Sequence, residues 1–483
     1  MRQALPLLFV ALAIRPALAQ QCPDGSPPPC AVQRLGPHLP SVVVLFMELR
    51  SQNAADSLLA EGLTLEIVNT LSGVTRLDVR SRWVSRRIAV DADPMRSAQA
   101  LGVDYVVDGV LEVDSVRVLA RGALVRTSTG RVVRPLRIER RRAELEGLQV
   151  AVAQEIAAAV VGRLLPAERA RFAVRHVDPR VTELLLSARA LRQQYTEAAI
   201  RQALVLARQA IAVDSVYAPA WVELANCHVL LRDFEPDSEN VFLDRGLLGA
   251  ERALALDSSD AAAMSRLASI RAMRNDLSPR TEALARRGAA GEPGVESGIA
   301  LARVLSFTDR VDEGLAIIRE ATRRDSLSPL VWAGAATRFQ GARQFAEAAN
   351  ALECALALRP SAKDSLALQG VRRWASMEAG DCAGSLVDGQ ATRDWPLVYE
   401  SLRCLRRTDE ADSIIDGQLA LSTVSPRNRA IYLAWRNKPD SAFAVLDRAF
   451  PNGLGVTLQH PAFVPYRHHP AYLALRRRMG LDR

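Results

Sequence analysis

Side chains able to do chemistry are few in this chain of 483 residues, and they do not form a familiar catalytic motif. Its lysines, Lys363 and Lys438, do not follow glycines, which excludes the phosphate-binding Gly-x-x-x-x-Gly-Lys loop. The sequence also lacks a Gly-x-Ser-x-Gly nucleophile turn, a His-Glu-x-x-His zinc motif and a Cys-x-x-Cys pair. These absences predict a protein that is not an enzyme and has no metal or cofactor. An enzyme with an unfamiliar site is the remote alternative.

Histidines and aspartates beside prolines come nearest to a metal site. His460, His468 and His469 lie close together in the sequence, but a metal site would need further ligands and residues to orient them. A capping or surface turn is therefore the favoured interpretation. Asp91 and Asp93 precede a predicted helix, whose N-terminus attracts carboxylates without any ion.

Two other polar features have ordinary structural explanations. His228 falls at helical spacing and is expected to be a packing or groove residue. The run Arg140–Arg142, with acidic residues around it, predicts a solvated helix start in preference to an anion site.

The six cysteines permit disulfides if the protein is exported. Cys22 and Cys30 bracket a stiff, proline-rich turn and are predicted to pair. The other four lie in helical patterns, where free cysteine is usually a small buried residue: Cys227, Cys354, Cys382 and Cys404. Pairing of Cys382 with Cys404 between neighbouring helices is left open.

The N-terminus has the pattern of a secretory signal peptide over 1–19. Arg2 precedes the apolar run Leu5–Ile14, and small residues at Ala17–Ala19 predict cleavage after Ala19. A proline-rich leader follows over 20–40, and no later apolar run reaches the ~18 residues that span a bilayer. We therefore expect a periplasmic or secreted protein without a membrane span and with possible envelope association. The net charge of +8 does not identify a nucleic-acid partner, and export argues against one.

Residues 41–170 are predicted to form an α+β domain with a mixed sheet, in the order β-α-β-α-β-β-β-α. Its strands are expected at 42–46, 77–79, 105–113, 115–127 and 131–138, and its helices at 56–71, 94–101 and 145–165. The sheet is expected to be mixed because helical crossovers precede a strand meander.

Part of this domain resembles a known module. The segments that carry the likeness are Ala60–Ile67, Ala100–Gly109 and Thr129–Val133. They resemble the TolB N-terminal-like (FlgO-like) module over 42–165, which often precedes tetratricopeptide repeats in bacterial envelope and signalling proteins. The chain departs from that module's usual pattern at Leu45–Met47 and at Arg134.

A repeat of 34 residues dominates the remainder of the chain. In the window 329–362 the residues that match are Trp332, Ala335, Ala336, Phe339, Ala348, Leu352, Ala355 and Pro360. Small residues let paired helices approach closely, large residues fill the remaining space, and a proline ends the second helix. This spacing resembles the tetratricopeptide repeat and predicts an all-α solenoid over 180–455.

Other units keep this frame less strictly. The window 295–328 follows it, and Trp221 opens a unit with roughly nine extra residues near 233–240. Residues 261–294 look degenerate, and four breakers predict a loop there: Gly288, Gly291, Pro293 and Gly294. We expect six to eight units, closed by a C-terminal cap over 456–483.

First helices of stacked units line a concave groove, which predicts a scaffold that binds a protein or peptide there. The groove positions fall at Asn226, Arg303, Thr337, Glu296 and Gln340. The alternative is an envelope sensor whose α/β domain binds a small molecule or an envelope component.

Overall fold

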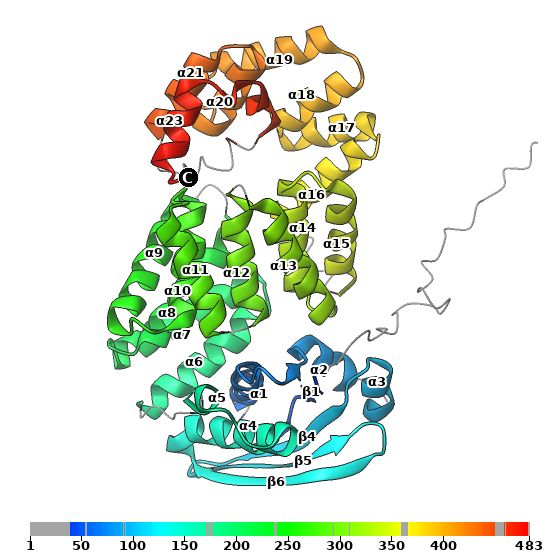
Figure 1. Ribbon diagram of the computed structural model, residues 1–483, viewed down its shortest axis with the longest axis vertical. Coiled ribbons are helices and arrows are strands. Elements are labelled where there is room, and N and C mark those ends of the chain that lie inside the picture. Colours follow the sequence, from blue (N-terminus) through cyan, green and yellow to red (C-terminus); the bar gives the residue numbers. More distant parts are fainter. Residues whose placement is uncertain are drawn as a thin grey trace, which may run out of the picture.

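The computed structural model describes residues 39–481, apart from 54–55, 90, 92, 171, 173–176, 236–238, 293, 309, 359–365, 450–457 and 459. The predicted signal peptide, the leader up to residue 38, Cys22, Cys30 and Pro360 lie outside these residues. An α/β domain lies at the bottom of Figure 1, and an array of helices rises from it.

A mixed sheet forms the α/β domain, as predicted. Its strands are β1 (Ser41–Val44), β2 (Glu48–Arg50), β3 (Asp78–Val79), β4 (Tyr105–Val113), β5 (Arg117–Arg126) and β6 (Arg131–Arg141). They are ordered β3-β1-β4-β5-β6, and β2 also pairs with β4. Strand β1 is parallel to β3 and β4, whereas β4, β5 and β6 form an antiparallel meander.

Helices cover both faces of this sheet. Helices α1 (Asp56–Ser72) and α4 (Leu145–Val161) pack on one face, and α2 (Arg82–Ala89) and α3 (Pro94–Ala100) pack on the other. Successive side chains of a strand point to opposite faces. Val42 and Val44 accordingly join the first core, and Val43 joins the second.

The chain order of this domain differs from the prediction. Strand β2 and helix α2 are additional, so the order up to α4 is β-β-α-β-α-α-β-β-β-α. The buried apolar residues of helix α2 are only Val84 and Ile88, which give a weak periodic signal in the sequence. The expected helix over 145–165 ends at Val161 because Gly162 adopts φ 72, a left-handed conformation that terminates helices.

Sixteen described helices then form eight antiparallel pairs with tetratricopeptide-like packing. The pairs are α6 (Pro179–Arg192) with α7 (Glu197–Val213), α8 (Ala218–Leu231) with α9 (Glu239–Leu256), α10 (Ala261–Met273) with α11 (Pro279–Gly291), α12 (Val295–Ser306) with α13 (Val311–Arg324), α14 (Pro329–Gly341) with α15 (Phe345–Leu358), α16 (Leu366–Glu378) with α17 (Cys382–Thr392), α18 (Trp395–Cys404) with α19 (Thr408–Ala420), and α20 (Pro426–Trp435) with α21 (Pro439–Ala449). Short elements complete the chain: η1 (Arg142–Glu144), α5 (Pro166–Ala170), η4 (Pro461–Tyr466) and α23 (Pro470–Arg478).

The repeat-defining residues behave alike in different units. Ala336, Ala348 and Ala355 are fully buried between helices. The indole N–H of Trp221 donates to the carbonyl of Ser215 at 2.9 Å, and that of Trp332 donates to the carbonyl of Ser326 at 2.8 Å. Both tryptophans are only half-buried. Each tryptophan therefore stabilises the turn before its own helix through a hydrogen bond, in addition to packing there.

The predicted loop around Gly288 and Gly291 is wrong, because both glycines lie within helix α11. A Cβ at Gly288 would lie 2.3 Å from Ser265 Oγ, and one at Gly291 would lie 2.7 Å from the Ala261 Cβ. The glycines thus permit close contact between α10 and α11, and this unit is a regular helix pair.

The last helices return to the middle of the array. Tyr472, Leu475 and Met479 share one core with residues of α10 and α12. The amide of Leu277, in the turn before α11, donates to the carbonyl of Met479 at 2.9 Å. No described helix combines the length and the hydropathy that crossing a membrane requires.

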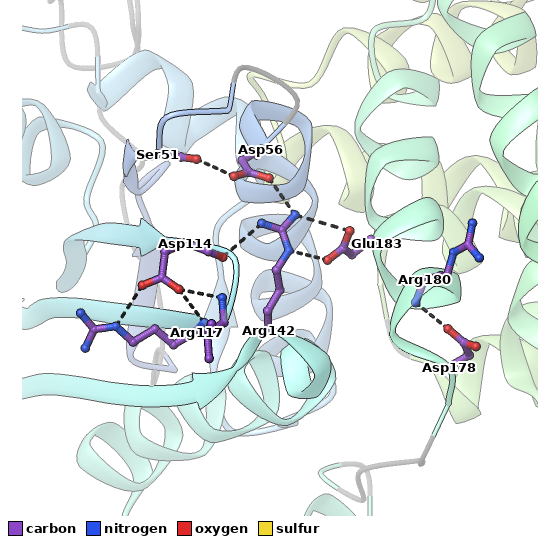
Figure 2. Close-up of polar contacts among 9 residues, drawn as sticks. Ser51, Asp56, Asp114, Arg117, Arg142, Asp178, Arg180 and Glu183 are labelled. Carbon is purple, nitrogen blue, oxygen red and sulfur yellow. Dashed lines mark hydrogen bonds and ion pairs between the residues drawn. The ribbon is translucent and has the colours of Figure 1, made fainter.

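A partly buried ion bridge joins the α/β domain to the first repeat (Figure 2). The Arg142 Nε lies 2.8 Å from Glu183 Oε1 on α6, and its Nη2 lies 2.9 Å from Asp56 Oδ1 at the start of α1. Ser51 Oγ donates to the other oxygen of Asp56. The prediction of a solvated helix start is therefore wrong for Arg142, which is a link between domains.

The α/β domain also contacts the repeats at two further places. Helix α1 lies against α6, where Gly62 faces the backbone of Leu186. Ser81 Oγ, before α2, donates to Asp325 Oδ1 at the end of α13. The α/β domain thus contacts the first helix pair and the end of the fourth, and it covers part of the inner face of the repeats.

Candidate functional site on the inner face of the repeats

The first helices of successive units stand side by side and form the inner face of the array. Helices α6, α8, α10, α12 and α14 each contact the next first helix along the chain. Since each first helix repeats the same orientation, equivalent positions from several units converge on one surface. Polar side chains on this surface gather in two places.

The first place is a cavity of about 310 Å³ between the two domains, which we call the interdomain chamber. One wall comes from α1, the end of β3 and the start of α2, and the other from α6, α8, α10, α12 and the start of α14. Its polar lining includes Glu66, Arg189, Arg192, Gln193, Glu223, Asn226, Ser265, Arg266, Glu292, Glu296 and Asp325.

An ion-pair network holds one side of the interdomain chamber. Glu223 is buried, and its Oε1 lies 2.7 Å from Arg192 Nε. Arg189, which lies with Arg192 on α6, places its Nη1 2.5 Å from Oε1 of Glu66 on α1. Arg192 and Gln193 approach Glu296 Oε1 at 3.8 and 2.9 Å. This network couples the α/β domain to three first helices.

The second place is the arginine cluster, formed by Arg232, Arg303 and Arg338. Arg303 Nη1 lies 3.2 Å and Arg232 Nη1 2.8 Å from the sulfur of Met273. Arg338 stacks over the Phe307 ring, 5.4 Å from its centroid. Asp233 pairs with Arg232 at 3.0 Å. No carboxylate of the described residues pairs with Arg303 or Arg338.

The electrostatics of the arginine cluster are unfavourable without a partner. Arg303 Nε and Arg338 Nη1 are buried and have no hydrogen-bond acceptor among the described residues. Burial lowers the pKa of Arg303, and the charges of Arg338 and Arg232 lower it further, whereas the charge of Asp233 opposes this shift. Burial likewise lowers the pKa of Arg338 to about 10, so the group remains cationic at neutral pH.

Three of the five predicted groove residues lie in these two places. Asn226 and Glu296 line the interdomain chamber, and Arg303 belongs to the arginine cluster. Thr337 Oγ1 donates to the carbonyl of Gly334 at 2.9 Å and is thereby satisfied within α14. Gln340 is half-buried on α14, and neither it nor Thr337 lines the interdomain chamber.

Sequence reasoning missed Ser265, Arg266 and Arg338. Arg338 follows the expected groove position by one residue, and Ser265 and Arg266 lie in the unit that looked degenerate. A search for arginines on neighbouring first helices would have found Arg266, Arg303 and Arg338 together.

The histidines have structural contacts. The Nδ1 atoms of His460 and His469 accept backbone amides of Ala462 and Ala471, so both histidines cap short helices. Asp93 caps α3 in the same way, through the amide of Arg96. Across the part of the chain that the structure describes, no three His, Cys, Asp or Glu side chains are grouped to hold a metal ion.

His228 lies inside the second helix pair and packs against the Phe242 ring. Burial lowers its pKa from 6.5 to about 4, and Arg208 and Arg245 lower it further. The unfolded chain therefore binds a proton below pH 6.5 that the folded chain accepts only near pH 4, so acid favours unfolding.

We expect His228→Leu to remove part of this acid sensitivity. Wild-type protein should lose up to about 3 kcal/mol of stability between pH 6.5 and pH 4 through this group, and the variant should not. Denaturant unfolding at several pH values measures the difference. His468→Leu, at an exposed position, serves as the control. If the free energy of unfolding changed equally with pH in all three proteins, the expectation would be contradicted.

One disulfide is present among the described cysteines. Cys382 and Cys404 are bonded, with Cα atoms 6.1 Å apart, and they join α17 to the end of α18. Cys227 and Cys354 are free, and burial raises the pKa of both thiols. The pairing left open by the sequence is thus present. The predicted Cys22–Cys30 pair lies outside the described residues.

Comparisons with solved structures find TPR proteins among the similar chains. A thermophilic TPR protein from Thermus thermophilus is 21% identical. The match covers 38% of this chain and 89% of the Thermus chain, with a TM-score of 0.27. YrrB, a TPR protein with an unusual peptide-binding site, is 15% identical over 39% of this chain and 91% of its own, with a TM-score of 0.24. The human IFIT1 dimer with m7Gppp-AAAA is 11% identical. The match covers 84% of this chain and 97% of the IFIT1 chain, with a TM-score of 0.40.

At such low TM-scores these likenesses carry no information about function. No family model and no curated protein sequence matches the chain.

Proposed function

We propose that this chain is a non-catalytic protein-binding scaffold whose repeats take up an acidic segment of a partner protein on their inner face. The observation that carries the proposal is the arginine cluster. Arg303 and Arg338 each bury a guanidinium nitrogen without an acceptor, and no described carboxylate pairs with either residue. Burying an unpaired charge is costly, so a partner carboxylate at this position would be strongly favoured.

The surroundings of the arginine cluster favour a polypeptide over a nucleic acid. Glu66, Glu223, Glu296 and Asp325 line the neighbouring interdomain chamber and would repel a continuous phosphate backbone. Phe307, which is half-buried and stacks under Arg338, offers apolar surface for a side chain next to the acidic residue. A segment with separate charged and apolar residues suits this lining.

Export to the periplasm or the cell exterior is part of the proposal. The N-terminal pattern of a signal peptide supports it, and so does the Cys382–Cys404 disulfide, because such bonds persist mainly in oxidising compartments. The likeness of residues 42–165 to the TolB N-terminal-like module agrees with an envelope role.

The alternative function is that of an envelope sensor. The observation that favours it is the position of the interdomain chamber, which both domains line. A ligand there would contact α1 and the first helices at once, so occupancy would stabilise one arrangement of the two domains.

Charge reversal tests the scaffold proposal. Affinity purification from intact cell envelopes should recover partner proteins with the wild type and lose them with Arg303→Glu/Arg338→Glu. Each lost ion pair to a buried arginine is expected to cost about 2 kcal/mol or more, which is over tenfold in Kd per site.

Arg323→Glu/Arg324→Glu is the matched control, because it changes the charge equally at exposed positions of α13. Arg303→Met/Arg338→Met separates loss of charge from misfolding, since replacing unpaired buried charges with methionine should preserve the fold. Equal recovery of every partner by the wild type and both Arg303/Arg338 variants would refute the proposal.

A further inference from the structure

The interdomain chamber has unsatisfied polar groups that its own ion-pair network does not use. Asn226 and Ser265 are each only 6% exposed, yet Asn226 Oδ1 and Ser265 Oγ have no hydrogen-bond partner among the described residues. Arg266 Nε is also buried without an acceptor there. All three residues line this one cavity, from the neighbouring helices α8 and α10. Unsatisfied buried polar groups are rare in native proteins, and a bound ligand that pairs with them is one explanation.

The orientation of the Asn226 amide is fixed by its neighbour. Its Nδ2 donates to Glu223 Oε2 at 3.5 Å, and the opposite orientation would place Oδ1 against that carboxylate. Asn226 Oδ1 is therefore an acceptor that awaits a donor, such as an ammonium group.

Arg266 supplies the complementary charge. The other chamber arginines, Arg189 and Arg192, are paired with Glu66 and Glu223. Arg266 forms no ion pair with a described residue, so its guanidinium is available to a carboxylate. One acceptor and one cation in a single cavity match a molecule that carries both an ammonium and a carboxylate.

The remaining walls define the size and polarity of that molecule. They carry apolar side chains from both domains: Leu65, Val68, Val79, Trp83, Ile299 and Val331. A volume of about 310 Å³ lies at the lower end of the range for ligand sites. We propose that the interdomain chamber binds a free α-amino acid with an apolar side chain, with Arg266 on its carboxylate and Asn226 on its ammonium group.

This site is separate from the arginine cluster and does not depend on the proposed partner. A bound amino acid would touch α1 of the α/β domain and α8, α10 and α12 of the repeats, and would stabilise their docking by mass action.

Thermal unfolding and calorimetric titration of the full chain test the proposal. The probes are leucine, methionine, phenylalanine and valine at millimolar concentration, with leucinamide and N-acetylleucine as analogues lacking one charge each. We expect a saturable rise in Tm of about 2 °C or more with at least one amino acid and a response at least tenfold weaker with both analogues. Absence of binding by all four amino acids would overturn the proposal.

Two variants on α10 locate the site. Arg266→Met should weaken the binding of the responsive amino acid at least tenfold. Because Arg266 forms no ion pair with a described residue, the substitution breaks no salt bridge. Arg271→Met is the matched control, because Arg271 lies on the same helix, pairs with Glu251 and does not line the chamber. Equal affinities of the two variants would place any binding elsewhere and would also overturn the proposal.

Discussion

The substitution Gly62→Ala is expected to loosen the α/β domain from the repeats. A Cβ at this position would lie 2.3 Å from the carbonyl oxygen of Leu186, a backbone atom that cannot move without shifting helix α6. Overpacking of this kind typically costs about 1–3 kcal/mol, and we expect about 3 kcal/mol here. Scanning calorimetry should record a lower Tm, and amide exchange should accelerate in α1 and α6.

Gly147→Ala is the matched control for this prediction. Gly147 lies in helix α4 of the same domain, and the nearest atom to an added Cβ is Arg140 Nε at 3.9 Å. Since alanine is the better helix former, this variant should gain about 0.5–1 kcal/mol. Similar stability changes in the two variants would mean that α1 does not dock on α6 as described.

The second large effect is expected from Arg142→Met. Asp56 is buried, with 3% of its side chain exposed, and the variant leaves its carboxylate without the guanidinium of Arg142. Breaking a buried pair by removing one partner costs about 3–5 kcal/mol, and partial exposure of Arg142 reduces our expectation to about 2–3 kcal/mol. Denaturant unfolding measures the loss.

The neighbouring Arg141 provides the control. Its side chain is 75% exposed and pairs with Glu144 on the surface. Arg141→Met should therefore change stability by less than about 0.5 kcal/mol. A loss of the same size in both variants would show that Arg142 is not a link between domains.

The helix pairs could be predicted from the sequence because close packing restricts residue type at fixed intervals. Each unit needs small residues where its paired helices touch. Buried alanines meet this need in the best-framed unit, at Ala336, Ala348 and Ala355. The same reasoning failed at Gly288, since a glycine that permits helix contact has the same sequence signal as a glycine that ends a helix.

The candidate site could be predicted only in part, because it depends on contacts between distant segments. Position within a repeat identified Asn226, Glu296 and Arg303 as inner-face residues. It could not reveal that α1 covers Asn226 and Glu296 and encloses a chamber there. Repeat position also could not identify which arginines have no ion-pair partner. Arg192 and Arg266 differ in this respect only because folding gives them different neighbours.

Site-specific photo-crosslinking in intact cells tests the central claim, that the inner face of the repeats binds a partner. A photoreactive residue would replace Gln340, a predicted groove residue two positions after Arg338 on α14, or Glu320, on the outer helix α13. The account predicts a discrete crosslinked protein from position 340 that disappears when Arg303 and Arg338 are changed to glutamate, and no such product from position 320. Crosslinks of equal yield from both positions, or a product from position 340 that persists after the charge reversal, would contradict it.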